Sequence, residues 1–125
     1  MMGEGSLPPG VRVIRQGGLA AIEEPSNSAH VYPVARLDEA TSSMSITRVD
    51  IDGRHQWLSS QRSTRLYFVV LGQLVFHLQG ADPISVATGD ALVIPRNCFY
   101  DLEGTATYLV INTPAFEDGD DMYLS

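Results

Sequence analysis

The sequence predicts a single all-β domain, built as a sandwich or a barrel. Its 125 residues are enough for one compact domain with a core of its own. From residue 44 onward, short runs rich in Val, Ile, Tyr and Phe alternate with turns rich in Gly, Asp and Pro. No segment between these runs has a helical periodicity of useful length. Regular short strands form sandwiches or barrels because both arrangements protect the edges of the sheets.

The first 43 residues are the least regular part. Residues 1–10 are rich in Gly and Pro and are expected to form a flexible arm, which leaves 11–125 as the domain. The apolar run Val11–Ile14 predicts a short strand that ends at Gly17 and Gly18. Residues 19–43 have mixed polarity and predict a loop, with a strand near Val31–Val34.

The strand pattern becomes clear after this point. Residues Met44–Ile51 alternate between apolar and polar, as a half-buried strand does. Two apolar runs joined at Gly72 and Gln73 predict a pair of strands, and two more runs follow. These four further strands are expected at Leu66–Leu71, Leu74–Leu78, Ala91–Ile94 and Thr107–Asn112.

Charge excludes several classes of partner. The net charge of −7 and the isoelectric point near 4.7 argue against binding to nucleic acid or to an anionic membrane. All eight basic residues are Arg, so Schiff-base catalysis and lysine-bound pyridoxal phosphate are excluded, since both need an amine side chain. The acidic run Glu117–Asp121 is expected to be a solvated end.

Cellular location is predicted from what the chain lacks. Cys98 is the single cysteine, so no internal disulfide forms, and its expected role is packing. The N-terminus has no basic start followed by an apolar run, as a signal peptide would. The longest apolar stretch, Leu66–Leu78, is too short to span a bilayer. A soluble cytoplasmic protein is therefore expected.

Two spaced motifs lie in the central part of the chain. The first reads Gly53, five residues, Ser59, one residue, Gln61, three residues, Arg65, six residues, Gly72.

The second motif begins 17 residues after the first ends. It reads Gly89, five residues, Pro95, one residue, Asn97, two residues, Tyr100, three residues, Gly104. Together the two motifs resemble those of the cupin family, G-x5-H-x-H-x3-4-E-x6-G and G-x5-P-x-G-x2-H-x3-N. The resemblance covers about 60 residues and implies a jelly-roll β-barrel.

The residues that bind metal in the family are replaced in this chain. Ser59, Gln61, Arg65 and Tyr100 stand at the positions of the family's His, His, Glu and His ligands. Serine and glutamine are weak neutral donors, and the arginine is a permanent cation that would repel a divalent ion. We therefore expect no metal and no other cofactor.

The resemblance also predicts which side chains face the inside of the barrel. Because alternate residues of a strand share a face, Trp57 should lie beside Ser59 and Gln61 as a substrate-binding residue. Tyr67 should follow Arg65 inward on the next strand, and Val69 and Leu71 after it. A few polar groups in an apolar pocket are typical of a small-molecule site.

Three residues are candidates for catalysis: Arg65, Tyr100 and His55. Arg65 would stabilise negative charge on a carbonyl- or carboxylate-bearing ligand, or it would pair internally with Asp50, Asp101 or Glu103. A shift of one residue would instead point Thr64 inward. Near Arg65, Tyr100 would have a lowered pKa and would donate a hydrogen bond or a proton.

The remaining polar candidates are less directly tied to the motifs. His55, just before the Trp57–Gln61 strand, is expected at the mouth of the pocket as a general acid or base, or as an exposed loop residue. His77 and His30 are expected to be structural. Arg48, on the strand Met44–Ile51, is a second candidate for a cation in the pocket.

Three functions of different classes fit these observations. The first is a metal-independent enzyme that carries out isomerisation, cyclisation, dehydration or epimerisation. The second is a non-catalytic binding or regulatory protein, and the third is a structural subunit whose barrel is filled by aromatic side chains. An open lumen of several hundred Å³ would separate the first two from the third. A homodimer is also expected, with Val11–Ile14 adding to the partner's sheet.

Overall fold

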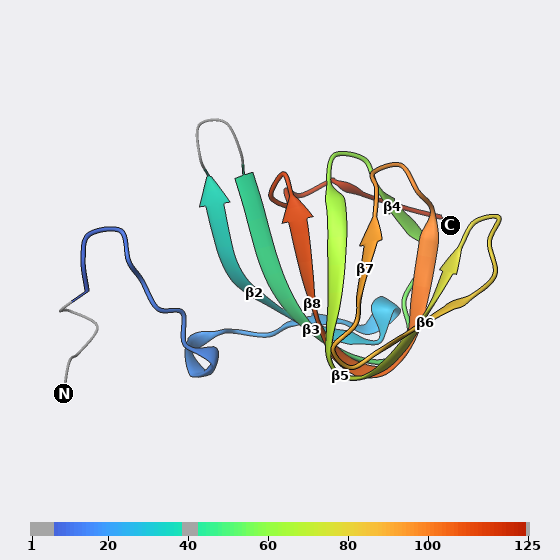
Figure 1. Ribbon diagram of the computed structural model, residues 1–125, viewed down its shortest axis with the longest axis horizontal. Coiled ribbons are helices and arrows are strands. Elements are labelled where there is room, and N and C mark those ends of the chain that lie inside the picture. The colour runs from blue at the N-terminus through green and yellow to red at the C-terminus, as the bar shows by residue number, and fades with distance from the viewer. Residues whose placement is uncertain (1–6, 39–42, 125) are drawn as a thin grey trace.

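The computed structural model describes residues 7–38 and 43–124 and confirms the all-β prediction. The described strands pair into one curled sheet (Figure 1). The strands are β1 (Ile22–Glu24), β2 (Ala29–Asp38), β3 (Ser43–Arg54), β4 (Leu58–Ser60), β5 (Thr64–Leu78), β6 (Ile84–Ala87), β7 (Ala91–Ile94), β8 (Tyr100–Thr113) and β9 (Asp121–Tyr123). Two short 3₁₀ turns, η2 (Gln16–Gly18) and η3 (Pro25–Asn27), precede β2, and neither has the length of a membrane-spanning helix.

Strand β8 organises the barrel because it pairs with three other strands. One edge of β8 pairs with β3, and the other edge pairs with β5 along nearly its whole length. Strand β5 also pairs with β7 and β6 at its two ends. Near its beginning, β8 contacts β4, and β4 in turn pairs with β9. The last described strand therefore returns to close one end of the barrel.

The N-terminal predictions need correction. Residues Val11–Ile14 are not a strand but an exposed, irregular segment beside β2 and β3. The strand expected near Val31–Val34 is confirmed, but it extends over ten residues as β2, where a loop was predicted. Most of the predicted arm, residues 1–6, lies outside the described residues.

A single bent strand replaces the predicted pair at Leu66–Leu78. Strand β5 runs without a break from Thr64 to Leu78 and bends next to Gly72, after a bulge between Val69 and Leu71. Gly72 has a φ of +94°, which other residues adopt only with strain. The bulge turns Leu71 outward, where it is 67% exposed, so the prediction that it faces inward was wrong.

The core lies inside the curled sheet and follows the alternation of the strands. Strand β5 contributes Tyr67 and Val69 before its bend, and Leu74 and Phe76 after it. Strand β8 contributes alternate residues on the facing side, including Leu102. Cys98 packs at the edge of this cluster, in agreement with its expected role.

The outer face of the sheet carries a second apolar surface. The strand register places two rows of side chains side by side across β2, β3, β8, β5 and β7. We call this surface the outer strip; its rows are Ala35–Ile46–Ile111–Leu66–Val93 and Tyr32–Arg48–Leu109–Phe68–Ala91. Phe68 is 37% exposed and Val93 is 59% exposed.

The bend of β5 gives a test of the fold. A Cβ atom at Gly72 would lie 2.9 Å from the Cα of Ala106 and closer still to the carbonyl oxygen of Thr105. We expect Gly72→Ala to lower the free energy of unfolding by at least about 2 kcal/mol, through strain and overpacking. Gly17→Ala is the matched control, since no atom lies within 4 Å of its Cβ position. Equal midpoints for the two variants in chemical denaturation would contradict this account of the bend.

Candidate functional site

A cavity of about 120 Å³ opens inside the barrel between β2, β3, β5 and β8. Its walls are mainly apolar, with polar groups from several elements. The apolar lining consists of Ala29, Val31, Val49, Leu58, Val110 and Phe116. The polar lining consists of Glu24, Thr47, His55, Arg65, Tyr67, Tyr108, Asn112, Asp121 and Tyr123. The volume is below the roughly 300–1,000 Å³ of a typical drug-sized pocket and below the several hundred Å³ expected of an open lumen. The barrel is therefore largely filled by side chains, and the cavity has room only for a molecule of a few heavy atoms.

Arg65 is the central polar residue of this cavity. It is 4% exposed and points inward, so Thr64 is not the inward residue. Its Nε donates to Asn112 Oδ1 at 2.6 Å, its Nη1 donates to the Tyr100 hydroxyl at 3.2 Å, and its Nη2 forms an ion pair with Asp121. The predicted internal partner thus exists, but it is Asp121 rather than Asp50, Asp101 or Glu103.

Tyr100 lies behind Arg65 rather than on the cavity wall. Its hydroxyl is 2.5 Å from the hydroxyl of Tyr67 and accepts a hydrogen bond from Arg65. Burial raises the pKa of Tyr100 and outweighs the lowering by Arg65 and the hydrogen bonds. The prediction of a lowered pKa was therefore wrong, and Tyr100 is a neutral phenol that holds the guanidinium in place.

The charge of Arg65 is secured by its neighbours. Burial alone would lower its pKa, but the Asp121 carboxylate and the hydrogen bond to Tyr100 raise it above the ordinary value. A guanidinium has five N–H groups, and the three hydrogen bonds use one each. Two N–H groups thus have no protein partner within the described part of the chain. Because Arg65 lines the cavity, these donors are available to a ligand.

His55 lines the same cavity, near the position predicted for it. Its Nδ1 lies 2.8 Å from the carbonyl oxygen of Gln56, which can only accept a hydrogen bond. Nδ1 therefore carries the proton of the neutral ring, and Nε2 keeps its lone pair. Burial lowers the pKa of His55, so the imidazole is neutral near pH 7. Nε2 has no hydrogen-bond partner among the described residues, so the neutral imidazole has the form of a general base.

Two carboxylates also line the cavity, and the sequence did not single out either as a site residue. Asp121 begins β9 and neutralises Arg65. Glu24 ends β1, and its Oε1 accepts a hydrogen bond from the amide of Asn27 at 3.1 Å. Both carboxylates act on His55 by raising its pKa, although burial dominates.

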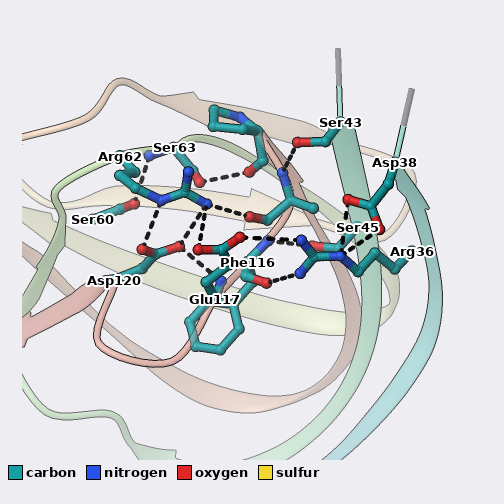
Figure 2. Close-up of polar contacts among 12 residues, drawn as sticks. Arg36, Asp38, Ser43, Ser45, Ser60, Arg62, Ser63, Phe116, Glu117 and Asp120 are labelled. Atoms are coloured by element: carbon teal, nitrogen blue, oxygen red, sulfur yellow. Dashed lines mark hydrogen bonds and ion pairs between the residues drawn. The ribbon is translucent and has the colours of Figure 1, made fainter. Parts of the chain in front are cut away.

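The acidic segment Glu117–Asp121 is anchored, contrary to the prediction of a solvated end. Figure 2 shows its contacts with two arginines that come from distant elements. Arg62 pairs with Asp120 at 2.9 Å, and Arg36 pairs with Glu117 at 3.2 Å. Asp120 is buried, and its pKa is lowered because the bonds from Arg62 and the backbone outweigh burial.

Two serines of β3 anchor the start of this segment. The Ser43 hydroxyl accepts from the backbone N–H of Ala115, and the Ser45 hydroxyl accepts from that of Phe116, both at 3.0 Å (Figure 2). These contacts hold Phe116 at the cavity wall and direct the chain toward Asp121. The arginine and serine contacts together position two cavity residues that lie more than 50 positions from Arg65 in sequence.

Tyr108 is another site residue that sequence reasoning missed. It is 3% exposed and lines the cavity from β8, and burial raises its pKa. Its hydroxyl has no hydrogen-bond partner among the residues that the structure describes, so it is free to donate to a ligand. The alternation of β8 from Tyr100 through Asn112 could have identified both Tyr108 and Asn112.

Three predicted substrate-binding residues do not reach the cavity. Leu58 of β4 lines it instead, which reverses the expected face of the strand. Ser59 is buried on the other side, Gln61 is exposed, and Trp57 is half-buried away from the cavity. The inward prediction failed because β4 is only three residues long and its orientation is set by pairing with β9.

The prediction that Arg48 is a pocket cation was also wrong. Its neighbours Thr47 and Val49 line the cavity, so Arg48 projects from the opposite face into the outer strip. There its guanidinium lies 4.1 Å from the centre of the Tyr32 ring. Its Nε is buried and has no acceptor among the described residues.

The remaining charged and histidine candidates pair with residues outside the cavity. Asp101 is fully buried and pairs with Arg54 at 2.6 Å. His77 pairs with Glu103, and His30 pairs with Glu23, both away from the cavity, in agreement with their expected structural roles. Within residues 7–38 and 43–124, no group of three His, Cys, Asp or Glu side chains is placed to hold a metal ion.

Similar solved structures support the assignment of the fold. Pac13, described as a unique nucleoside dehydratase, matches with a TM-score of 0.78 at 20% identity, over 91% of this chain and 91% of that chain. An RmlC-like cupin from Shewanella frigidimarina matches with a TM-score of 0.68 at 15% identity, over 83% and 91%. The chain has the cupin fold.

A third match agrees with this assignment. KdgF from Halomonas sp. has a TM-score of 0.74 at 18% identity, and the match covers 86% of this chain and 97% of that chain. No protein-family model and no curated protein sequence matches the chain. Structural likeness at these identities establishes the fold alone, so the chemistry must be argued from the cavity.

The buried Arg65–Asp121 pair gives a test of the site's construction. Arg65→Met would leave the Asp121 carboxylate without its cation, and we expect a loss of about 3–5 kcal/mol in the free energy of unfolding. Tyr100→Phe removes one acceptor and should cost about 1–3 kcal/mol. Arg96→Met, at an exposed loop position, is the control. If Arg65→Met were as stable as the control in urea denaturation, the pair would not hold the barrel together.

Proposed function

We propose that this cupin binds a small organic molecule in its cavity and carries out metal-independent acid–base chemistry on it. One observation carries the proposal: a neutral imidazole with a free Nε2 and a buried guanidinium with unused donors line the same small cavity. The first group can remove a proton, and the second can stabilise the negative charge that this creates.

The proposed reaction begins at a carbon next to a carbonyl group. His55 Nε2 takes a proton from that carbon, and the electrons of the broken C–H bond move into the carbonyl, which becomes an enolate. Arg65 and the Tyr108 hydroxyl donate hydrogen bonds to the enolate oxygen. Return of the proton to the same or a neighbouring carbon gives epimerisation or isomerisation. Loss of a hydroxyl group, protonated as it leaves, gives dehydration.

Among the three residues expected to be catalytic, one role changes. Tyr100 does not line the cavity, so it acts as a positioning residue for Arg65, and Tyr108 takes its place as the phenol that contacts the ligand. Tyr67 and Asn112 also line the cavity and complete the polar wall.

The neighbours are consistent with this class of reaction. Pac13 is described as a nucleoside dehydratase, and a Streptomyces Pac13 structure contains uridine. Dehydration is acid–base chemistry of the kind proposed here. A non-catalytic binding or regulatory protein remains the alternative, with the same polar groups serving only to orient the ligand.

Hydrogen exchange with solvent tests the proposal directly. Hydroxyacetone, dihydroxyacetone and glyceraldehyde are incubated with the protein in D₂O, and loss of the C–H signal is followed by NMR. We expect exchange above background for at least one compound, with His55→Gln slower by about 10²–10⁴-fold. The rate should rise with pH through the pKa of His55, below its ordinary 6.5, because only the unprotonated ring accepts a proton.

A matched pair of variants locates the reaction. Val110 lines the cavity, whereas its neighbour Leu109 lies in the outer strip. Val110→Phe should block both binding and exchange, and Leu109→Phe should affect neither. Binding that is blocked by Val110→Phe, without any exchange, would favour the binding protein over the enzyme. Exchange that survives Val110→Phe would place the chemistry outside the cavity.

We also propose that a second copy of the chain covers the outer strip. The strip crosses five strands and is mainly apolar, with Arg48 as its one charged residue and with exposed Phe68 and Val93 at one side. Surfaces of this kind are typical of interfaces rather than of solvated sheet faces. Since Val11–Ile14 is not a strand, we assign the interface to the strip instead.

Light scattering tests this assembly. We expect the mass of two chains at micromolar concentration and the mass of one chain for Phe68→Glu, because the added carboxylate would be buried in the interface. Gln79→Glu, at an exposed position outside the strip, is the control and should remain a dimer. A monomeric wild type would refute the proposal.

A further inference from the structure

We infer that the cavity selects neutral molecules carrying both a hydrogen-bond acceptor and a donor, and that it excludes carboxylates and phosphates. The inference rests on the proposed function, since it concerns the ligand of the same cavity. It narrows the ligand predicted from sequence, which was a carbonyl- or carboxylate-bearing molecule. The balance of charge around Arg65 determines this selectivity.

The single guanidinium in the cavity is already neutralised. Among the described residues that line it, Arg65 is the one permanent cation, and its Nη2 is paired with Asp121. Both side chains are largely buried, with 5% and 19% of their surface exposed. An incoming carboxylate would have to compete with a fixed protein carboxylate for the same guanidinium. Arg65 therefore offers hydrogen-bond donors to a ligand but little net positive charge.

A second carboxylate makes the cavity negative. Glu24 lines it, and its one hydrogen bond within the described residues comes from the neutral amide of Asn27. His55 does not compensate, because its ring is neutral near pH 7. One guanidinium set against two carboxylates leaves an excess of one negative charge. A further anion in this cavity would meet like-charge repulsion, which costs several kcal/mol at close range.

The hydrogen-bonding groups of the cavity favour a ligand of mixed character. Arg65 and the Tyr108 hydroxyl present donors, which suit a carbonyl oxygen. Glu24 and the Nε2 of His55 present acceptors, which suit a hydroxyl or amide N–H group. A neutral molecule with both kinds of group, such as a hydroxycarbonyl compound or a cyclic amide, would satisfy both sets. A carboxylate carries acceptors only.

Matched pairs of compounds test the inference on the full-length protein. The pairs are acetamide with acetate, benzamide with benzoate, and glyceraldehyde with glycerate, so that each pair differs mainly in charge. Dissociation constants are measured by NMR titration at pH 7.5. We expect the neutral member of each binding pair to bind at least about tenfold more tightly than its anion.

Two variants distinguish selection of the ligand by charge from selection by shape. Glu24→Gln removes the unpaired carboxylate and leaves the Arg65–Asp121 pair intact, so the preference for the neutral member should shrink. Asp121→Asn frees Arg65 and should reverse the preference in favour of the anion. Should Asp121→Asn not fold, Glu24→Gln still decides, because a purely steric preference would be unchanged in it.

The outcomes distinguish this inference from the proposed function. Equal or tighter binding of the anions by the wild type would overturn the inference, although the cavity would still be a binding site. Neutral preference without hydrogen exchange would support the inference and contradict the proposed catalysis. Failure of every compound to bind the wild type and both variants would contradict the binding site itself, and the inference with it.

Discussion

A guanidinium buried inside a barrel must be given partners, and the partners of Arg65 determine how the rest of the site is arranged. An unpaired charge in this position would cost several kcal/mol. Asn112 and Tyr100 reach it from the two ends of β8, and Asp121 reaches it from β9. The C-terminal segment is therefore part of the barrel, and its attachment through Arg36 and Arg62 supports the centre of the site.

This pairing changes what the cavity can recognise. Viewed alone, an arginine in an apolar pocket is a receptor for anions. With Asp121 beside it and Glu24 nearby, the same residue supplies donors within a negative environment. The resemblance implies that metal-binding cupins place a divalent cation and a glutamate in this region. Here Arg65 of β5 stands at the position of that glutamate and supplies the positive charge, and the carboxylate comes from Asp121 of β9.

Sequence reasoning predicted the framework better than the site. The resemblance in motif spacing implied the barrel and the inward position of Arg65. The alternation of β5 then placed Tyr67 on the same face, because alternation is a local property of a strand. Sequence reasoning failed for Leu58 and Asp121, which depend on the pairing of β4 with β9 across some 60 residues. Sequence reasoning also failed at Leu71, because a bulge there reverses the alternation of inward and outward side chains. No pattern in the sequence predicts this bulge.

The contacts of His55 are those that the proposed role as a base requires. The carbonyl oxygen of Gln56 keeps the ring proton on Nδ1, and burial lowers the pKa so that the ring is neutral. The lone pair of Nε2 is then available to accept a proton. The carboxylates that raise its pKa also make the imidazolium less costly once a proton has been taken. Arg65 acts in the opposite sense on the ring, yet it stabilises the negative charge left on the ligand. A neutral ligand suits this arrangement. In the proposed reaction, proton transfer would create a positive charge on His55, near the two carboxylates, and a negative charge on the ligand, near Arg65.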